Sequence, residues 1–196
     1  SEEFFRKCII LFEELNDRGQ MARGINDLAV TLVYAGKFAD GLPLFEEGLS
    51  IHYALDLPGE PGVPTTVKGF ALMHLGRYEE ALTHLQRSLS FYAKAEISYS
   101  IKNLGRIALA KNVYDTARQH LSEALTLFRD KSDMNGLGQT LGCLGYVALR
   151  QHNLRQARTY IGENLQLAAE TRIFLPSMTA LAGVALLYVE QGEYAA

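Results

Sequence analysis

Apolar residues recur along the chain at spacings of three and four residues, in stretches separated by short polar joints. This is the pattern of amphipathic helices, each with one face toward a core. Joints such as Ala35-Gly36-Lys37 and Leu75-Gly76-Arg77 are too short for anything but a tight turn, so we expect neighbouring helices to pair as antiparallel hairpins. The pattern predicts an all-α chain of about ten helices.

The same unit recurs at steps of 40, 36, 40 and 40 residues. A period of this length is typical of solenoids built from stacked hairpins. Two columns hold small residues, as close approach of paired helices requires, and others hold a turn residue or a large apolar one. These columns are Ala29, Gly69, Gly105, Gly145 and Ala185; Gly41, Ala81, Ala117 and Ala157; Gly36, Gly76, Asn112, His152 and Gly192; Phe38, Tyr78, Tyr114, Leu154 and Tyr194; and Phe45, Leu85, Leu121 and Ile161.

The repeat covers residues 1–196 and predicts one domain. Its expected parts are a half-hairpin over 1–18, hairpins over 20–55, 62–93, 97–130 and 135–171, and an unpaired first helix over 175–192. Asp17 and Asp133 hold equivalent places before a helix, where an aspartate can cap the first turn. Because the repeat is cut within a hairpin at both ends, we expect a piece of a longer protein.

Composition narrows the function. With 19 Lys and Arg against 22 Asp and Glu the net charge is −3, which argues against direct nucleic-acid binding. No apolar run reaches membrane-spanning length and no leader opens the chain, while Cys8 and Cys143 fit buried thiols of a reducing compartment. We therefore expect a cytoplasmic protein without membrane partners.

The sequence contains no recognisable catalytic or metal-binding motif. The five His residues show no metal-ligand spacing and no GxSxG nucleophile turn occurs. Asp40, Glu79, Glu80 and Asp115 fall near the start of second helices, where acids favour the helix dipole. We expect no enzyme activity, no metal and no cofactor.

The pairs Leu28-Ala29, Leu104-Gly105 and Leu144-Gly145, followed by a turn residue, a ring and Ala-x-x-x-large, resemble the tetratricopeptide repeat. The chain departs from that pattern in lacking its Trp and its closing Pro, and in its longer period. The resemblance implies a right-handed superhelical solenoid that binds proteins or peptides. The long period resembles the repeat regions of bacterial LuxR-type and maltose-regulator-like signalling proteins and transcriptional regulators. This second resemblance implies that the chain is the partner-sensing region of such a protein.

In this family the first helix of each hairpin lines a concave groove, and the ligand-facing positions can be carried over. They are Asn26, Val30, Tyr34, Phe70, Met73, His74, Lys102, Asn103, Arg106, Gln139, Tyr146 and Arg150. The three cations suit an acidic or carboxylate-bearing peptide, because arginine can bind such a group through two parallel hydrogen bonds. The alternatives are that the cations are solvated surface charges and that Phe70 and Met73 pack against a neighbouring helix.

A second class of function stays open. The chain could be an architectural spacer or a self-association module with no separate ligand. In that reading the exposed terminal helices would form a homodimer.

Overall fold

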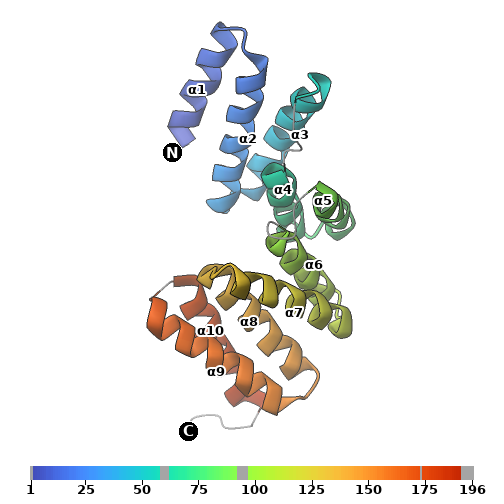
Figure 1. Ribbon diagram of the computed structural model, residues 1–196, viewed down its shortest axis with the longest axis vertical. Coiled ribbons are helices and arrows are strands. Elements are labelled where there is room, and N and C mark those ends of the chain that lie inside the picture. Colours follow the sequence, from blue (N-terminus) through green and yellow to red (C-terminus); the bar gives the residue numbers. More distant parts are fainter. Residues whose placement is uncertain (1, 58–61, 92–96, 173, 191–196) are drawn as a thin grey trace. The chain divides into compact units, whose positions relative to one another are not determined.

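The computed structural model describes residues 2–57, 62–91, 97–172 and 174–190, and these residues form ten α-helices and no strand (Figure 1). The prediction of an all-α chain of about ten helices is confirmed. The chain divides into two compact units, Ser1–Tyr92 and Ala93–Ala196. Gly192 and Tyr194, which continue two of the repeat columns, lie outside the described residues.

The first unit contains five helices. These are α1 (Glu2–Glu14), α2 (Arg18–Tyr34), α3 (Phe38–Ala54), α4 (Gly62–His74) and α5 (Tyr78–Phe91). Helices α2 and α3 form one hairpin and α4 and α5 a second, while α1 packs on α2. Helix α4 also contacts both α2 and α3, so the second hairpin stacks on the first.

The second unit repeats this arrangement. Its helices are α6 (Ser98–Ala110), α7 (Tyr114–Asp130), α8 (Met134–Arg150), α9 (Leu154–Thr171) and α10 (Phe174–Glu190). Helices α6 and α7 pair, as do α8 and α9, and α8 packs on both members of the preceding pair. Helix α10 in turn packs on α8 and α9. Within each unit, the first helix of one pair therefore touches the first helix of the next, α2 with α4 and α6 with α8.

Nearly every helix within the described ranges ends at a residue with left-handed backbone. These residues are Asn16, Gly36, Asp56 and Gly76 in the first unit and Asn112, Ser132, His152 and Arg172 in the second, 20 positions apart within each unit. At Gly36 the turn closes with two hydrogen bonds, from the amide of Gly36 to the carbonyl of Val33 and from the amide of Lys37 to that of Leu32. This closure satisfies carbonyls that the helix end leaves unpaired. The predicted turn column is thus confirmed at its four described positions.

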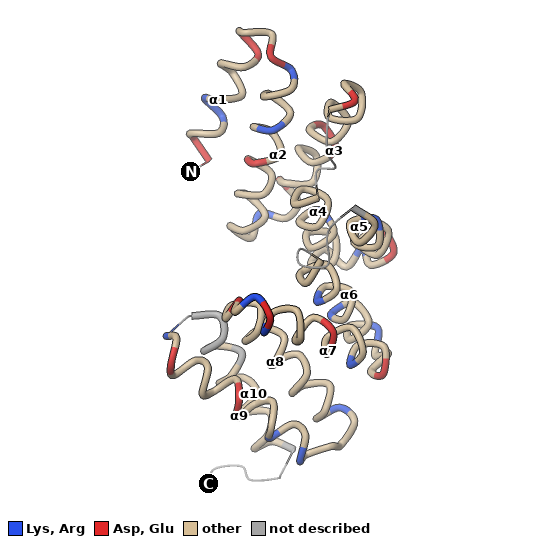
Figure 2. The backbone as a smooth tube through the Cα atoms, viewed as in Figure 1, with Lys and Arg blue, Asp and Glu red and all other residues tan. Residues whose placement is uncertain are grey.

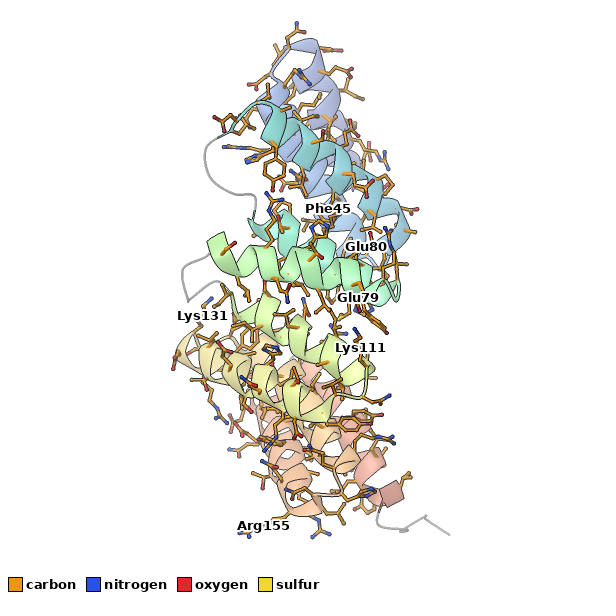
Figure 3. All side chains as sticks on the ribbon, turned by 90° about the vertical axis from the view of Figure 1, so that its right-hand side faces the viewer. Phe45, Glu79, Glu80, Lys111, Lys131 and Arg155 are labelled. Atoms are coloured by element: carbon orange, nitrogen blue, oxygen red, sulfur yellow. The ribbon has the colours of Figure 1, made fainter. Side chains whose placement is uncertain are left out.

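The small-residue columns bring paired helices close together, as predicted. A Cβ atom placed on Gly105 of α6 would lie 2.7 Å from Cγ of Leu121 and 3.3 Å from the carbonyl oxygen of Ala117, both in α7. Gly69 of α4 meets α5 in the same way. The large apolar column fills the space beside these crossings, where Phe45, labelled in Figure 3, is fully buried on α3.

Capping side chains fix the starts of three helices. Oδ1 of Asp17 accepts from the amide of Gln20, and Oδ1 of Asp133 accepts from that of Gly136, at 3.0 and 2.9 Å. Both predicted caps are confirmed, and Asn153 caps α9 in the same way. Such a cap stabilises a helix by about 1 kcal/mol.

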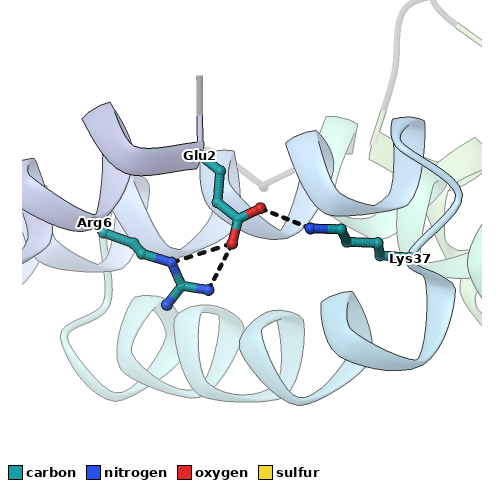
Figure 4. Close-up of polar contacts among 3 residues, drawn as sticks. All are labelled: Glu2, Arg6 and Lys37. Carbon is teal, nitrogen blue, oxygen red and sulfur yellow. Dashed lines mark hydrogen bonds and ion pairs between the residues drawn. The ribbon is translucent and has the colours of Figure 1, made fainter.

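A surface ion cluster ties α1 to the turn between α2 and α3 (Figure 4). The Glu2 carboxylate accepts from the Arg6 guanidinium and, at 2.9 Å, from the Lys37 ammonium. Lys37 and then Arg6 lower the pKa of Glu2. Because these groups are exposed, the cluster contributes little to stability.

Basic and acidic residues are both scattered over each unit, among helices that are mostly uncharged (Figure 2). This mixed pattern fits the small net charge of −3. None of the described helices is both long enough and apolar enough to cross a membrane.

Candidate functional site

Lys102 lies near the middle of α6, on the side that contacts α8, and only 2% of it is exposed. Its Nζ donates a hydrogen bond of 2.8 Å to Oε1 of Gln139 on α8 and sits 4.5 Å from the centre of the Tyr99 ring. Burial and, to a smaller extent, the positive charge of Arg106 together lower the pKa of Lys102 to about 7. The alternative of a solvated surface charge is therefore wrong for Lys102.

Arg106 follows Lys102 by one helical turn and is only partly exposed. Burial lowers the pKa of its guanidinium, against a smaller opposing influence from Cys143 of α8. The Cys143 thiol has its own pKa raised by burial, with Arg106 and Lys102 acting in the other direction. Two cations one turn apart thus share a poorly hydrated position beside α8, where an anion would be attracted.

A row of hydrogen bonds joins α6 to α8 along this face. The hydroxyl of Tyr99 donates to Oδ2 of Asp133 at 2.8 Å, next to the bond between Lys102 and Gln139. The Gln139 amide then donates to Oδ1 of Asn135, one turn earlier on α8. Since Lys102 occupies the Gln139 oxygen and Asn135 takes an amide hydrogen, the Gln139 side chain is held in one orientation.

Arg150 and Tyr146 stand on the last two turns of α8. Nε of Arg150 donates to the hydroxyl of Tyr114 on α7 at 3.1 Å, and the Tyr146 side chain is 39% exposed. The predicted basic residues of this unit therefore all lie on α6 and α8, with Lys102 inside, Arg106 half-covered and Arg150 at the surface. We call the face that carries Arg106, Gln139, Tyr146 and Arg150 the α6–α8 face.

The remaining predicted residue of this unit, Asn103, is buried, and its Oδ1 has no hydrogen-bond partner. The same holds for Asn26 of the first unit, whose Oδ1 would be 2.6 Å from a Cβ atom on Gly48 of α3. Asn26 therefore fits into a gap left by that glycine. Both asparagines lie among packed helices in this structure.

Other predicted residues of the first unit form an aromatic cluster. His74 stacks on Phe38 with ring centres 4.6 Å apart, and Phe70 meets both rings edge-on. Met73 is buried, which fits the packing alternative. Of the other two positions, Val30 is partly covered and Tyr34 is 71% exposed.

Sequence reasoning did not identify Tyr99 or Asn135 as members of this row of hydrogen bonds. The available signal was helical spacing, because Tyr99 precedes Lys102 by three residues and Asn135 precedes Gln139 by four. Within the described ranges, no three His, Cys, Asp or Glu side chains gather as metal ligands. What the α6–α8 face offers is hydrogen bonding and positive charge.

Comparisons with known proteins agree with this architecture. The family model of the tetratricopeptide repeat matches residues 65–130. No curated protein matches the sequence significantly. The solved structures that resemble the chain do so at low sequence identity, so they establish its fold.

One similar structure is BtubC (BKLC) from P. vanneervenii, with a TM-score of 0.73 and 16% identity over 98% of this chain and 81% of that one. Another is a Podospora anserina kinesin light chain of nearly identical repeats, with a TM-score of 0.68 and 15% identity over 90% of this chain and 88% of that one. A third is the APC/C hetero-tetramer Cut9–Hcn1, with a TM-score of 0.68 and 17% identity over 99% of this chain but 37% of that one. The chain therefore matches the tetratricopeptide repeat over residues 65–130 and has the fold of tetratricopeptide-repeat solenoids.

Proposed function

We propose that this chain is a protein-binding scaffold whose α6–α8 face takes an acidic or carboxylate-bearing segment of a partner protein. The observation that carries the proposal is the pairing of Lys102 and Arg106. Both cations are largely withdrawn from water, and each is next to the other. A bound carboxylate would place a negative charge beside both cations and so favour their charged forms.

The residues of the α6–α8 face would contribute to binding in different ways, according to their burial and hydrogen bonds. Lys102 is covered, so its role is to hold Gln139 and to add positive potential from behind. Arg106 and Arg150 are accessible enough to meet a ligand directly, and exposed Tyr146 offers a ring surface next to them on α8. Interface arginines and tyrosines contribute strongly to binding when a partner covers them.

We place this scaffold in the cytoplasm, as the partner-sensing region of a larger bacterial regulatory protein. The support is the 40-residue period, which is longer than the usual tetratricopeptide repeat and resembles the repeats of such regulators. The mixed charge pattern of Figure 2 favours a protein ligand over nucleic acid. No catalytic step is proposed for this chain.

The test is a pull-down from a bacterial lysate with the natural chain and with Arg106→Glu and Arg150→Glu as baits. Reversal at Lys102 is avoided because it would bury a carboxylate. Arg118→Glu is the matched control, since Arg118 is an exposed arginine of α7 whose partner, Asp115, lies on the same helix. We expect a partner that the natural chain and the control retain and that both α6–α8 variants lose. Equal recovery by all four baits would refute the proposal.

A second candidate, self-association, is favoured by the exposed apolar residues of α1 and α10. Large apolar side chains that are at least one third exposed include Phe4, Ile10 and Leu11 on α1 and Met178, Leu181, Leu186, Tyr188 and Val189 on α10. Exposed apolar side chains favour association with another chain where they gather on one face. Light scattering after gel filtration tests this, because Leu11→Gln and Leu181→Gln should shift a dimer to monomer. A monomeric natural chain would exclude this candidate.

A further inference from the structure

A hollow of about 240 Å³ lies in the first unit between α3, α4 and α5. Three basic side chains converge on it, Lys68 from α4 and His84 and Arg87 from α5. Two hydroxyl-bearing residues, Ser50 of α3 and Thr65 of α4, also line it, and Glu46 of α3 is the one carboxylate among its lining residues. Hydrogen-bond donors from three helices therefore surround one cavity.

Lys68 is the most enclosed of these groups, at 9% exposure. Its Nζ lies 3.8 Å from Oε1 of Glu46, which is long for a hydrogen-bonded ion pair. The Glu46 side chain is 63% exposed, so it can leave this position at little cost. Burial lowers the pKa of Lys68 more than the Glu46 carboxylate raises it. The ammonium is thus only partly compensated.

Arg87 and His84 add positive charge to the same space. The Arg87 guanidinium lies over the Tyr53 ring, 4.8 Å from its centre, and this contact holds it at the edge of the hollow. Burial lowers the pKa of His84, and so do Lys68 and Arg87. The opposing carboxylates, Glu80 of α5 and Glu46 of α3, act more weakly.

We propose that this hollow is a binding site for a phosphate monoester group. A phosphate of this kind carries a charge of about −1.5 to −2 at neutral pH and three strong acceptor oxygens. Lys68, Arg87 and the hydroxyl of Ser50 can donate to these oxygens, and a protonated His84 can add a further donor. A single carboxylate would match fewer of these donors and less of the charge.

The site is distinct from the α6–α8 face and does not depend on the function proposed for it. It belongs to the first unit, and within α4 it uses Thr65 and Lys68. Residues two apart on a helix project about 200° from each other. Lys68 therefore points away from Phe70, the nearest residue of α4 that sequence reasoning assigned to the groove.

Phosphate binding must be linked to the protonation of His84. In the unoccupied hollow Lys68 and Arg87 disfavour the imidazolium, and Glu46 and Glu80 only partly offset them. A bound dianion reverses the net field, so the pKa of His84 rises toward or above its ordinary 6.5. By linkage, the phosphate dianion binds more tightly as pH falls through that range, until the phosphate takes up its own second proton at a pKa of about 6.

The experiment is a pH titration of the histidine Cε1 resonances by NMR, with the whole chain in chloride and then with added inorganic phosphate. His84→Gln assigns the resonance. We expect the pKa of His84 to rise with phosphate and to stay unchanged with added chloride. A parallel titration uses a short phosphoserine peptide and its unphosphorylated form, because the phosphate could come from a modified partner or from a free ion.

Three variants make the result decisive. Lys68→Met should weaken phosphate binding about tenfold. Glu46→Gln should strengthen it, because that change removes the carboxylate that competes for Lys68, and it leaves the buried residues in place. Arg118→Gln, on α7 of the second unit, should have no effect.

The relative affinity for the two probes shows whether the phosphate comes from a modified partner or from a free ion. Tighter binding of the phosphoserine peptide than of inorganic phosphate would assign the site to a modified partner, and equal binding would assign it to the free ion. The proposal is overturned if neither probe moves the pKa of His84. It is also overturned if Glu46→Gln weakens the binding that Lys68→Met leaves intact.

Discussion

Replacing Lys102 with methionine should change how stability depends on pH. The pKa of Lys102 is about 7 in the folded chain, whereas the ordinary lysine value of 10.5 applies in the unfolded chain. Below the pKa of the folded chain, Lys102 is protonated in both the folded and the unfolded state, and the buried charge destabilises the folded state by its full amount. Above it the folded state releases the proton while the unfolded state keeps it, so stability rises with pH up to the unfolded pKa. Between about pH 6 and pH 9 this amounts to about 3 kcal/mol.

Methionine has a similar length and no charge, so Lys102→Met lacks this dependence. Its stability advantage over the natural chain should therefore fall by about 3 kcal/mol from pH 6 to pH 9. Other titrating groups are common to both proteins and largely cancel in the difference. The assay is urea unfolding followed by circular dichroism at several pH values.

Lys111→Met is the control, because Lys111 is exposed at the end of α6 (Figure 3). Because Lys111 is exposed, its replacement removes a charge without relieving a burial penalty, and it reports what the loss of one lysine does by itself. Parallel pH curves for the natural chain and Lys102→Met would refute the assignment of a lowered pKa to Lys102.

Three further predictions concern the helix contacts and ends, all measured by urea unfolding. Gly105→Ala should destabilise by about 1–3 kcal/mol because its Cβ meets α7, whereas Gly162→Ala, in open space on α9, should stabilise by about 0.5–1 kcal/mol; equal effects would contradict the close approach. Asp133→Ala removes a helix cap and the hydrogen bond from Tyr99, so it should lower the free energy of unfolding by about 2 kcal/mol. Asp17→Ala removes only a cap and should lower it less. His152→Gly, at a φ of 54°, should stabilise by about 1 kcal/mol, and a loss would argue against left-handed strain there.

The sequence was most informative where a pattern depends on neighbours along one helix. The turn residues, the caps at Asp17 and Asp133, and the close approach at Gly105 could all be predicted, because each acts within a helix, at its end or inside one hairpin. The positions carried over from the family include cations on α6 and α8, and these two helices are adjacent. That the cations line a binding groove stays a prediction.

Burial within that set could not be predicted. Lys102 and Arg106 are one turn apart on α6, yet Lys102 is covered while Arg106 is partly open. The difference arises because Gln139, from the next hairpin, reaches across to the ammonium. The place of a residue on one helix does not predict which side chain of the next hairpin will cover it.

The residues that line the proposed phosphate site could not be grouped from the sequence, for a related reason. Lys68, His84 and Arg87 come from two helices, and Glu46 from a third, so no local spacing unites them. Lys68 also stands next to Gly69, in a stretch whose periodicity indicates only packing. A cluster of this kind exists only after hairpins have stacked.

The left-handed residues 20 positions apart have a consequence for how this chain can change in length. Because turns within hairpins and turns between them share one backbone geometry, the joints alone do not distinguish the first helix of a pair from the second. The small-residue columns do, because Gly69 and Gly105 on first helices and Ala81 and Ala117 on second helices stand at different distances from the preceding turn. Gain or loss of 40 residues within a unit therefore keeps turns and crossings in register. A change of 20 keeps the turns but sets large side chains where the helices must touch, so whole hairpins are the units in which this chain can grow.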